Sequence, residues 1–185
     1  DFGPGVGDMV IHAFARCGIR RTALTAEHMQ DARMATNLML SQWSNLLPLL
    51  WKVELGSVSL VQGDTTLTLA SDVLLILDAY LTTTSGSTST DRIMFPISRT
   101  DYAAFPDKTQ QGTPTVFWFN RQIIPQVKLW QVPDASSTYS FKYYYVRQVQ
   151  DANLTGGQNP QVPYRFFDAL AAGLAARLAE MYAPD

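Results

Sequence analysis

Apolar positions along the chain follow two different periods. Between Thr25 and Leu47 they recur every three or four residues, which is the spacing of one helix face. From Trp51 onward the spacing falls to two, which is typical of half-buried strands. Spacings of three and four return between Pro163 and about Tyr182. The pattern therefore predicts helices at both ends of the chain and strands between them.

Two helices are expected in the N-terminal region. A short helix spans Gly7 to Cys17, and a longer one has Thr25 as its N-cap and ends at Pro48. Met34 and Leu38 lie off the main apolar face of the longer helix and begin a second apolar line. We therefore expect this helix to contact both its own core and a neighbour.

The C-terminal helix has two different faces. Its bulky stripe consists of Phe167, Leu170, Leu174, Leu178 and Met181. A line of small residues, displaced from that stripe, includes Ala172, Ala176 and Ala179. A bulky face and a small face imply two packing partners, and the simplest arrangement returns this helix to the N-terminal ones.

The middle of the chain is rich in strand signals. The alternation that begins at Val53 slips at Gly56, which we interpret as a bulge. Asp72 to Leu81 is almost continuously apolar, as in a strand buried on both faces, although a short buried helix fits as well. Thr82 to Thr90 is polar and of low complexity, which indicates a mobile loop or an extended hairpin tip.

Val127 to Val149 is expected to form a β-hairpin around which the other strands assemble. Two runs of β-branched and aromatic residues flank the polar segment Pro133 to Ser137, where Pro and Asp favour a turn. Before it, Ser98 to Phe105 has the capping pattern of a short helix, and Thr115 to Phe119 has the composition of a strand.

These elements predict an α+β protein. Two N-terminal helices (residues 1–50) and a loop with the long C-terminal helix (151–185) form a helical layer, into which an antiparallel β-domain (51–150) is inserted.

Composition narrows the class of function. Only 16% of residues are charged, against roughly 25% in an average soluble domain, so much of the surface is expected to meet other proteins. The net charge of −2 disfavours a sequence-specific DNA binder. The single cysteine, Cys17, excludes an internal disulfide, and no apolar segment is long enough to span a bilayer. A soluble, intracellularly made protein is expected.

Residues with catalytic or metal-binding chemistry are sparse. His12 and Cys17 are five positions apart, about 140° around a helix, so they do not face each other. Asp8 with His12, and His28 with Asp31, have the spacing of surface pairs, whereas zinc needs three or four converging ligands. We therefore expect no enzyme, no metal and no cofactor.

Two aromatic trios, Phe117 to Phe119 and Tyr143 to Tyr145, have the composition of a stacking platform for sugars or bases. Because side chains alternate along a strand, the middle residue of each trio points away from the outer two. Core and subunit contacts explain the trios more simply, and a carbohydrate-binding β-module stays an alternative function.

Three segments stand in order along nearly the whole chain. The first is HAFARCGI, followed by LTAEHMQDARMATNLMLSQWSN and LPLLW; the second is DRIMFPISRTDYAAFPDKTQQGTPTVFWFNRQIIPQVKLWQVPDASSTYSFKYYYVR; the third is NPQVPYRFFDALAAGLAARLAE. Together they resemble the head-to-tail adaptor proteins of tailed bacteriophages, the ring-forming connector family that includes tail tubular protein A of short-tailed phages.

The resemblance implies a ring, commonly of about twelve copies, in the neck of a virion whose proteins are made in the host cytoplasm. Its partners would be the portal protein and a downstream tail or nozzle protein, with double-stranded DNA passing through the channel and no membrane involved. Twelve copies at −2 would carry about −24, and a channel through which DNA slides benefits from not being coated with phosphate-binding cations. A neighbouring tail-completion or tail-terminator ring is the alternative within phage structure.

Two sets of residues are the candidate contacts of such a ring. Contacts with other subunits or the portal are expected at Met34, Leu38, Ala172, Ala176 and Ala179. The polar tip formed by Thr84, Ser85, Gly86 and Ser87 is expected to face the tail or the lumen.

Overall fold

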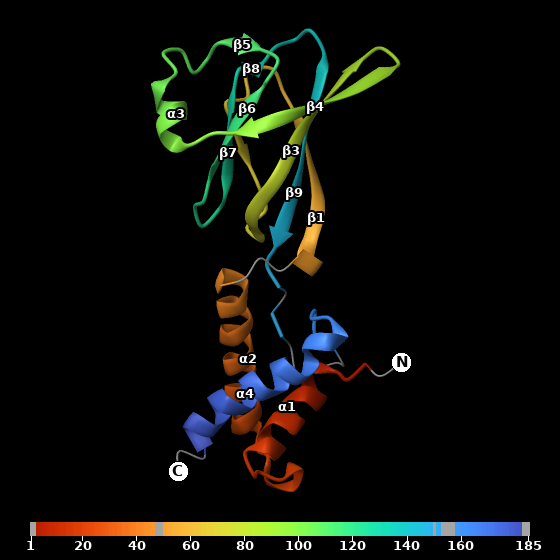
Figure 1. Cartoon of the computed structure of the whole chain (residues 1–185), viewed down its shortest axis with the longest axis vertical. Helices are drawn as coiled ribbons and strands as arrows, with labels where there is room; N and C mark the ends of the chain where they lie inside the picture. Colours follow the sequence, from red (N-terminus) through yellow and green to blue (C-terminus); the bar gives the residue numbers. More distant parts are fainter. Residues whose placement is uncertain (1–2, 47–49, 150, 153–157, 183–185) are drawn as a thin grey trace. The chain divides into compact units, whose positions relative to one another are not determined.

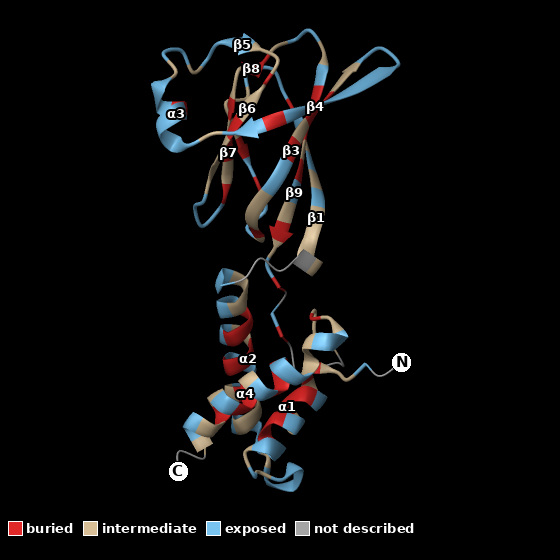
Figure 2. Cartoon of the chain, in the orientation of Figure 1, coloured by how far each residue is buried: buried red, intermediate tan, exposed pale blue. Residues whose placement is uncertain are grey.

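The computed structural model describes residues 3–46, 50–149, 151–152 and 158–182. The chain divides into two compact units, each with its own core (Figures 1 and 2). Residues 1–51 and 149–185 form the helical unit, and Lys52–Gln148 form the sheet unit. The α+β fold class is confirmed, because the N-terminal and C-terminal helices pack together and the intervening chain forms a mostly antiparallel sheet.

The described part of the helical unit contains three α-helices and short 3₁₀ turns. They are α1 (Val6–Arg16), η1 (Arg21–Ala23), α2 (Ala26–Leu46), η2 (Leu50–Lys52, which reaches the first residue of the sheet unit), η3 (Tyr164–Phe166) and α4 (Phe167–Tyr182). Helix α4 packs against both α1 and α2, as its bulky stripe predicts (Figure 1). Leu170, Leu174 and Leu178 of that stripe are buried, whereas Met181 is half exposed at its end.

Local sequence signals explain where these helices begin and end. Thr25 caps α2, because its Oγ1 accepts a hydrogen bond from the backbone N–H of His28 at 3.3 Å. Helix α1 is followed by Gly18, whose φ of 80° is the left-handed conformation that favours glycine. Pro48, expected to end α2, lies outside the described residues.

Seven strands form the main sheet, in the order β1 (Val53–Leu60), β9 (Thr138–Arg147), β3 (Val73–Ser85), β4 (Thr88–Pro96), β6 (Val116–Asn120), β7 (Gln126–Trp130) and β2 (Thr66–Thr68). All neighbours are antiparallel except β4 and β6. The short strands β5 (Gln111–Gly112) and β8 (Val132–Pro133) pair in parallel, and α3 (Arg99–Ala104) follows β4.

The sheet curls around one core. Its two end strands contribute to the same buried cluster, β1 through Leu60 and β2 through Leu67, together with Leu81, Phe117 and Phe141 from between them. Strands so far apart in the order share neighbours only if the sheet bends back on itself, so it approaches a barrel. In Figure 2 the buried residues, coloured red, lie along the strands of the sheet unit.

The expected hairpin at Val127–Val149 is wrong, although both of its strands exist. Strand β7 pairs with β6 and β2, whereas β9 pairs with β1 and β3. The chain between them leaves the main sheet through β8, and Trp130 stacks on Phe105 with ring centroids 4.0 Å apart. The turn signal is real, since Asp134 Oδ1 accepts the N–H of Ser136, but a local turn does not decide which strands pair.

The bulge expected at Gly56 is also wrong. Strand β1 pairs with β9 without interruption from Val53 to Leu60, and the register shifts lie in β3, between Val73 and Leu75 and between Ile76 and Asp78. Glycine stands at position 56 for a different reason, because the ring of Tyr143 lies against it.

The ambiguous segments of the middle region are resolved by the structure. Asp72 to Leu81 is a strand rather than a helix, and the polar run after it is the extended tip of the β3–β4 hairpin. The short helix predicted at Ser98 is confirmed, because Ser98 Oγ accepts the N–H of Asp101 and the Asp101 carboxylate accepts the N–H of Ser98.

Candidate assembly surfaces

The second apolar line of α2 lies on the surface of the helical unit. Met34 is 63% exposed and Leu38 is 55% exposed. With Met181 of α4 they line a shallow groove of about 200 Å³, bordered by Arg177 and Glu180. Exposed methionine and leucine side chains of this kind adapt to the shape of a partner at low cost.

The small-residue line of α4 forms a separate strip. Ala172 and Ala176 are exposed and Ala179 is half buried, on the side of the helix turned away from the leucine stripe. None of the three lines the groove beside Met34. The predicted contact residues therefore form two surfaces on the helical unit, and small side chains on the second would let another backbone approach closely.

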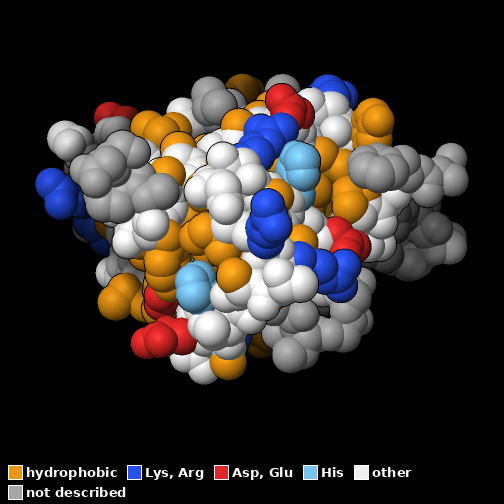
Figure 3. Space-filling view, turned by 90° about the horizontal axis from the view of Figure 1, so that it is seen from below, with side chains coloured by type: hydrophobic (Ala, Val, Ile, Leu, Met, Phe, Trp, Pro, Cys, Tyr) orange, Lys and Arg blue, Asp and Glu red, His pale blue; other side chains and the backbone are white. Residues whose placement is uncertain are grey.

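A wider groove of about 760 Å³ runs between α1 and α4. Met9 and Phe167 are among its apolar lining residues, and Arg16 pairs with Asp168 at its side. The Nε of Arg16 also donates to Nε2 of His12 at 3.2 Å. Figure 3 shows the lower face of the structure, where apolar side chains lie between scattered charges of both signs.

The polar tip of the β3–β4 hairpin is an ordered turn. Gly86 has a φ of 60° at the first central position of a two-residue loop, as in a type II′ turn, and Ser85, Gly86 and Ser87 are exposed. Thr84 is half buried, and its Oγ1 lies 2.9 Å from the Oγ of Ser89 across the hairpin.

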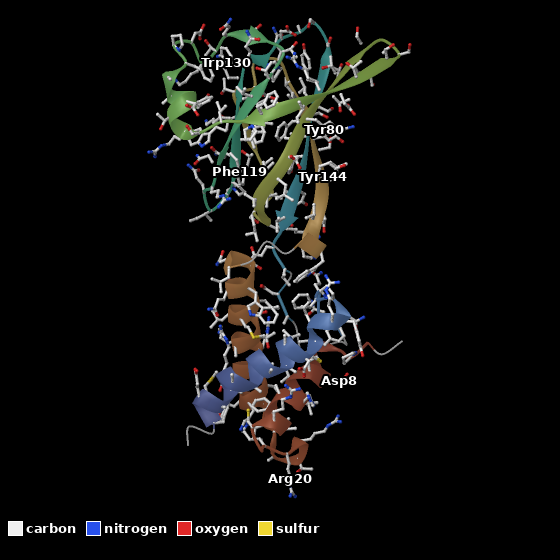
Figure 4. The ribbon with its side chains drawn as sticks, in the orientation of Figure 1. Asp8, Arg20, Tyr80, Phe119, Trp130 and Tyr144 are labelled. Atoms are coloured by element: carbon white, nitrogen blue, oxygen red, sulfur yellow. The ribbon has the colours of Figure 1, made fainter. Side chains whose placement is uncertain are left out.

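The outer face of the sheet carries an apolar patch that the sequence alone did not reveal. Ile93 and Phe95 are 59% and 60% exposed, while Met94 between them is buried. Ile93 is opposite Tyr80, whose ring lies 6.4 Å from that of Tyr144, and Figure 4 marks both tyrosines on adjacent strands. The apolar run from Ile93 to Phe95 is visible in the sequence. It does not show which of these side chains is exposed, because that depends on the strands that pair with β4.

A second unforeseen apolar surface is the loop between β6 and β7. Ile123 is 95% exposed and Ile124 is 55% exposed. This loop is the tip of the β6–β7 hairpin, whereas the sequence predicted a hairpin at Val127–Val149. Two neighbouring isoleucines in a turn are the signal that could have identified it, because such turns are usually polar.

The aromatic trios mostly serve the core. Phe117 and Tyr143 are buried, and Tyr145 packs beside Tyr143 with ring centroids 5.4 Å apart. Trp118 packs against Tyr102 of α3, and Tyr144 is the exposed middle residue of its trio. The predicted alternation of faces is confirmed, and it leaves no row of three rings open for a ligand.

The few residues with nucleophilic or metal-binding side chains have structural roles. Burial raises the pKa of the Cys17 thiol, whose Sγ donates to the carbonyl of Ala175 at 3.2 Å. A raised pKa keeps the thiol protonated, which is the opposite of what activates a nucleophile. The described part of the chain contains no cluster of three or more His, Cys, Asp or Glu residues that would hold a metal ion.

The residues expected to pair on helix surfaces, Asp8 with His12 and His28 with Asp31, bind other partners in the structure. The Asp8 carboxylate accepts the backbone N–H of Gly5, and His28 lies against Thr25, with Nδ1 2.6 Å from the threonine Oγ1. Asp31 accepts a hydrogen bond from the phenol of Tyr182. These contacts fix helix ends and the packing of α4 on α2.

A family model described as SU10 adaptor protein matches residues 10–185. The chain belongs to the SU10 adaptor protein family. None of the curated proteins matches the chain. Membership of the SU10 adaptor family identifies a phage adaptor protein, which is a structural class.

The surfaces of this SU10-family adaptor agree with a structural role. Exposed apolar residues lie on both units: Met34, Leu38 and Met181 on one, and Ile93, Phe95 and Ile123 on the other. No helix among those described has the length and apolar character needed to cross a membrane. Contacts with other proteins are the simplest use of such surfaces.

Proposed function

We propose that this SU10-family adaptor forms a ring that joins the portal vertex of a phage capsid to the tail. The family match over residues 10–185 carries the proposal. The exposed apolar line of Met34 and Leu38, beside the separate alanine strip of α4, supports it. A cyclic ring needs two different surfaces on every subunit, and the helical unit offers two.

The proposed ring has about twelve copies, like the tail tubular protein A-like adaptors that the sequence resembles. It lies in the virion neck after synthesis in the host cytoplasm, binds the portal protein on one side and receives the next tail or nozzle protein on the other. Double-stranded DNA passes through its channel without sequence-specific binding, and a net charge of −2 per copy is compatible with such passage. The Thr84–Ser87 turn is proposed to face the tail or the lumen.

The test is electron microscopy of the protein mixed with the portal protein of the same phage. A ring with a central channel, seated on the portal, is the expected result. A protein that stays monomeric and has no affinity for the portal would overturn the proposal. Binding to a tail protein but not to the portal would instead favour a tail-completion or tail-terminator ring.

A matched pair of variants locates the interface. The double substitution Met34→Asp and Leu38→Asp places two charges in the groove beside Met181 and is expected to abolish the ring while the subunit stays folded, since both side chains are exposed. The control is Arg33→Asp, an exposed position about 100° around α2 from Met34 and outside that groove, which is expected to assemble normally. Normal assembly of the double variant would exclude this groove as an interface.

A further inference from the structure

One edge of β4 is open over most of its length. The N–H of Phe95 donates to the carbonyl of Thr115 at 3.2 Å, so at Phe95 the backbone points away from β3 and is covered by β6. Backbone direction alternates along a strand, so Ser89, Asp91 and Ile93 point their N–H and C=O groups to the same side. Among the described residues these groups have no hydrogen-bond partner.

Strand β1, at one end of the sheet, also has an open edge. The N–H of Gln148 donates to the carbonyl of Asp72, which directs the even-numbered residues of β9 toward β3 and the odd-numbered ones toward β1. Gly56 is opposite Tyr143, so the even-numbered residues of β1 bond to β9. Leu55 and Ser57 therefore point outward, and no described residue accepts from or donates to their backbone.

We infer that the open edge of β4 pairs with the open edge of β1 of a second copy, so that adjacent subunits share one continuous sheet. The inference rests on the proposed ring. Thr88–Met94 and Val53–Leu60 are similar in length, and every subunit carries one edge of each kind. Joining two different edges is the head-to-tail contact that a cyclic ring requires.

Side chains beside the two edges fit this pairing. Leu55 is 51% exposed and Ile93 is 59% exposed, and both lie on the outer face of the sheet. Neither open edge carries the lysine or proline that often blocks pairing: β1 has neither, and the proline of β4, Pro96, lies beyond the open part. The charged residues of the two strands are Glu54 in β1 and Asp91 and Arg92 in β4. The Asp91 carboxylate already accepts a hydrogen bond from Oγ1 of Thr82 on the neighbouring strand β3, at 2.6 Å, so this charge has a partner within its own subunit.

Hydrogen exchange tests the pairing residue by residue. The ring assembled on its portal is labelled in D₂O, quenched, dissociated and read by fragmentation mass spectrometry, beside the isolated subunit. Amides of Ser89, Asp91, Leu55 and Ser57 are expected to exchange at least about a hundredfold more slowly in the ring. The amide of Thr90, which faces β3, should exchange equally in both states.

Each outcome has a distinct meaning. A ring in which the outward amides exchange as fast as in the free subunit overturns the pairing and leaves the proposed function standing. Protection of β4 without protection of β1 overturns the second copy as the occupant and indicates a different protein. No ring at all overturns the proposed function, and the pairing with it.

Proline substitutions give an independent readout. Ser89→Pro and Ser57→Pro each remove an outward N–H while leaving the bonds to β3 or β9 in place, so the subunit should fold but the ring population should fall at least about tenfold. The controls Ser89→Ala and Ser57→Ala remove the same hydroxyls and should assemble. If Ser89→Pro disturbs its hairpin, seen as faster exchange at Thr90, then Ser57→Pro alone decides. A folded proline variant that assembles normally overturns the pairing.

Discussion

The ring of Tyr143 lies directly against the backbone of Gly56, so that a Cβ at position 56 would be 2.4 Å from the Cζ of that ring. Both residues face the core side of the sheet, where β1 and β9 are paired. Tyr143 is only 5% exposed, and the rings of Phe141 and Tyr145 flank it, so its ring has little room to move. Glycine at position 56 is thus a packing requirement.

Gly56→Ala is expected to destabilise the sheet unit by about 1–3 kcal/mol, because the added methyl group must displace a buried ring. Urea denaturation followed by tryptophan fluorescence measures the change. Ser57→Ala, on the opposite face of the strand, is the control and should change stability by less than about 0.5 kcal/mol. Equal stability of Gly56→Ala and the natural chain would contradict this prediction, because the Tyr143 side chain would then move aside without a cost in free energy.

Leu174→Asp is expected to destabilise the helical unit by several kcal/mol, of the order of 3 kcal/mol or more, because Leu174 is 1% exposed within the leucine stripe. The control is Ala172→Asp on the exposed side of the same helix, which should leave the melting temperature nearly unchanged. Circular dichroism on heating measures both. An unchanged melting temperature for Leu174→Asp would show that the stripe is not core.

The hydrogen bond of Tyr182 is expected to make the free energy of unfolding depend on pH in the alkaline range. The hydrogen bond that its phenol donates to Asp31 raises the pKa of Tyr182 to about 12, above the ordinary value of about 10. Because the folded state holds this proton more tightly, the bond contributes fully below pH 10 and its contribution is lost as the pH rises to about 12.

The measurement compares the natural chain with Tyr182→Phe in urea denaturation from pH 8 to pH 12. The stability advantage of the natural chain should be largest at pH 8 and shrink between pH 10 and pH 12. Other tyrosines are present in both proteins, so their titration cancels in the difference. An advantage that is absent at pH 8, or that stays constant to pH 12, would contradict the role of this hydrogen bond.

Arg147 holds two carboxylates at one end of the sheet. Its Nε donates to Asp72 at 2.8 Å and its Nη1 to Glu54 at 3.2 Å, and these bonds raise the pKa of Arg147. Arg147→Met is expected to cost about 1–2 kcal/mol of stability, a modest value because all three side chains are more than a third exposed.

The matched variant is Arg147→Lys, which is expected to recover only part of the loss, since an ammonium group cannot bridge two carboxylates as a guanidinium does. Neutralising the acids by Glu54→Gln and Asp72→Asn in the Arg147→Met background should recover stability by removing their repulsion. Chemical denaturation at pH 7 measures all of them. No recovery on neutralisation would show that Arg147 acts through packing alone.

Features that depend on a few neighbouring residues were determined by the sequence itself. Thr25 as a cap, the Ser98–Asp101 capping pair and the leucine stripe of α4 involve residues within one or two helical turns. The second apolar line of α2 likewise identified Met34 and Leu38 as surface residues, because helical periodicity assigns each position to a face.

Only the tertiary structure decided which strands meet. Alternation shows that Val127–Trp130 and Thr138–Arg147 are strands, but it does not choose partners, and β7 packs with β6 while β9 lies between β1 and β3. Strand pairing is set by how all faces share one core, which is a long-range condition. The same condition placed Tyr143 over Gly56, brought Met181 beside Met34, and left the edges of β1 and β4 open.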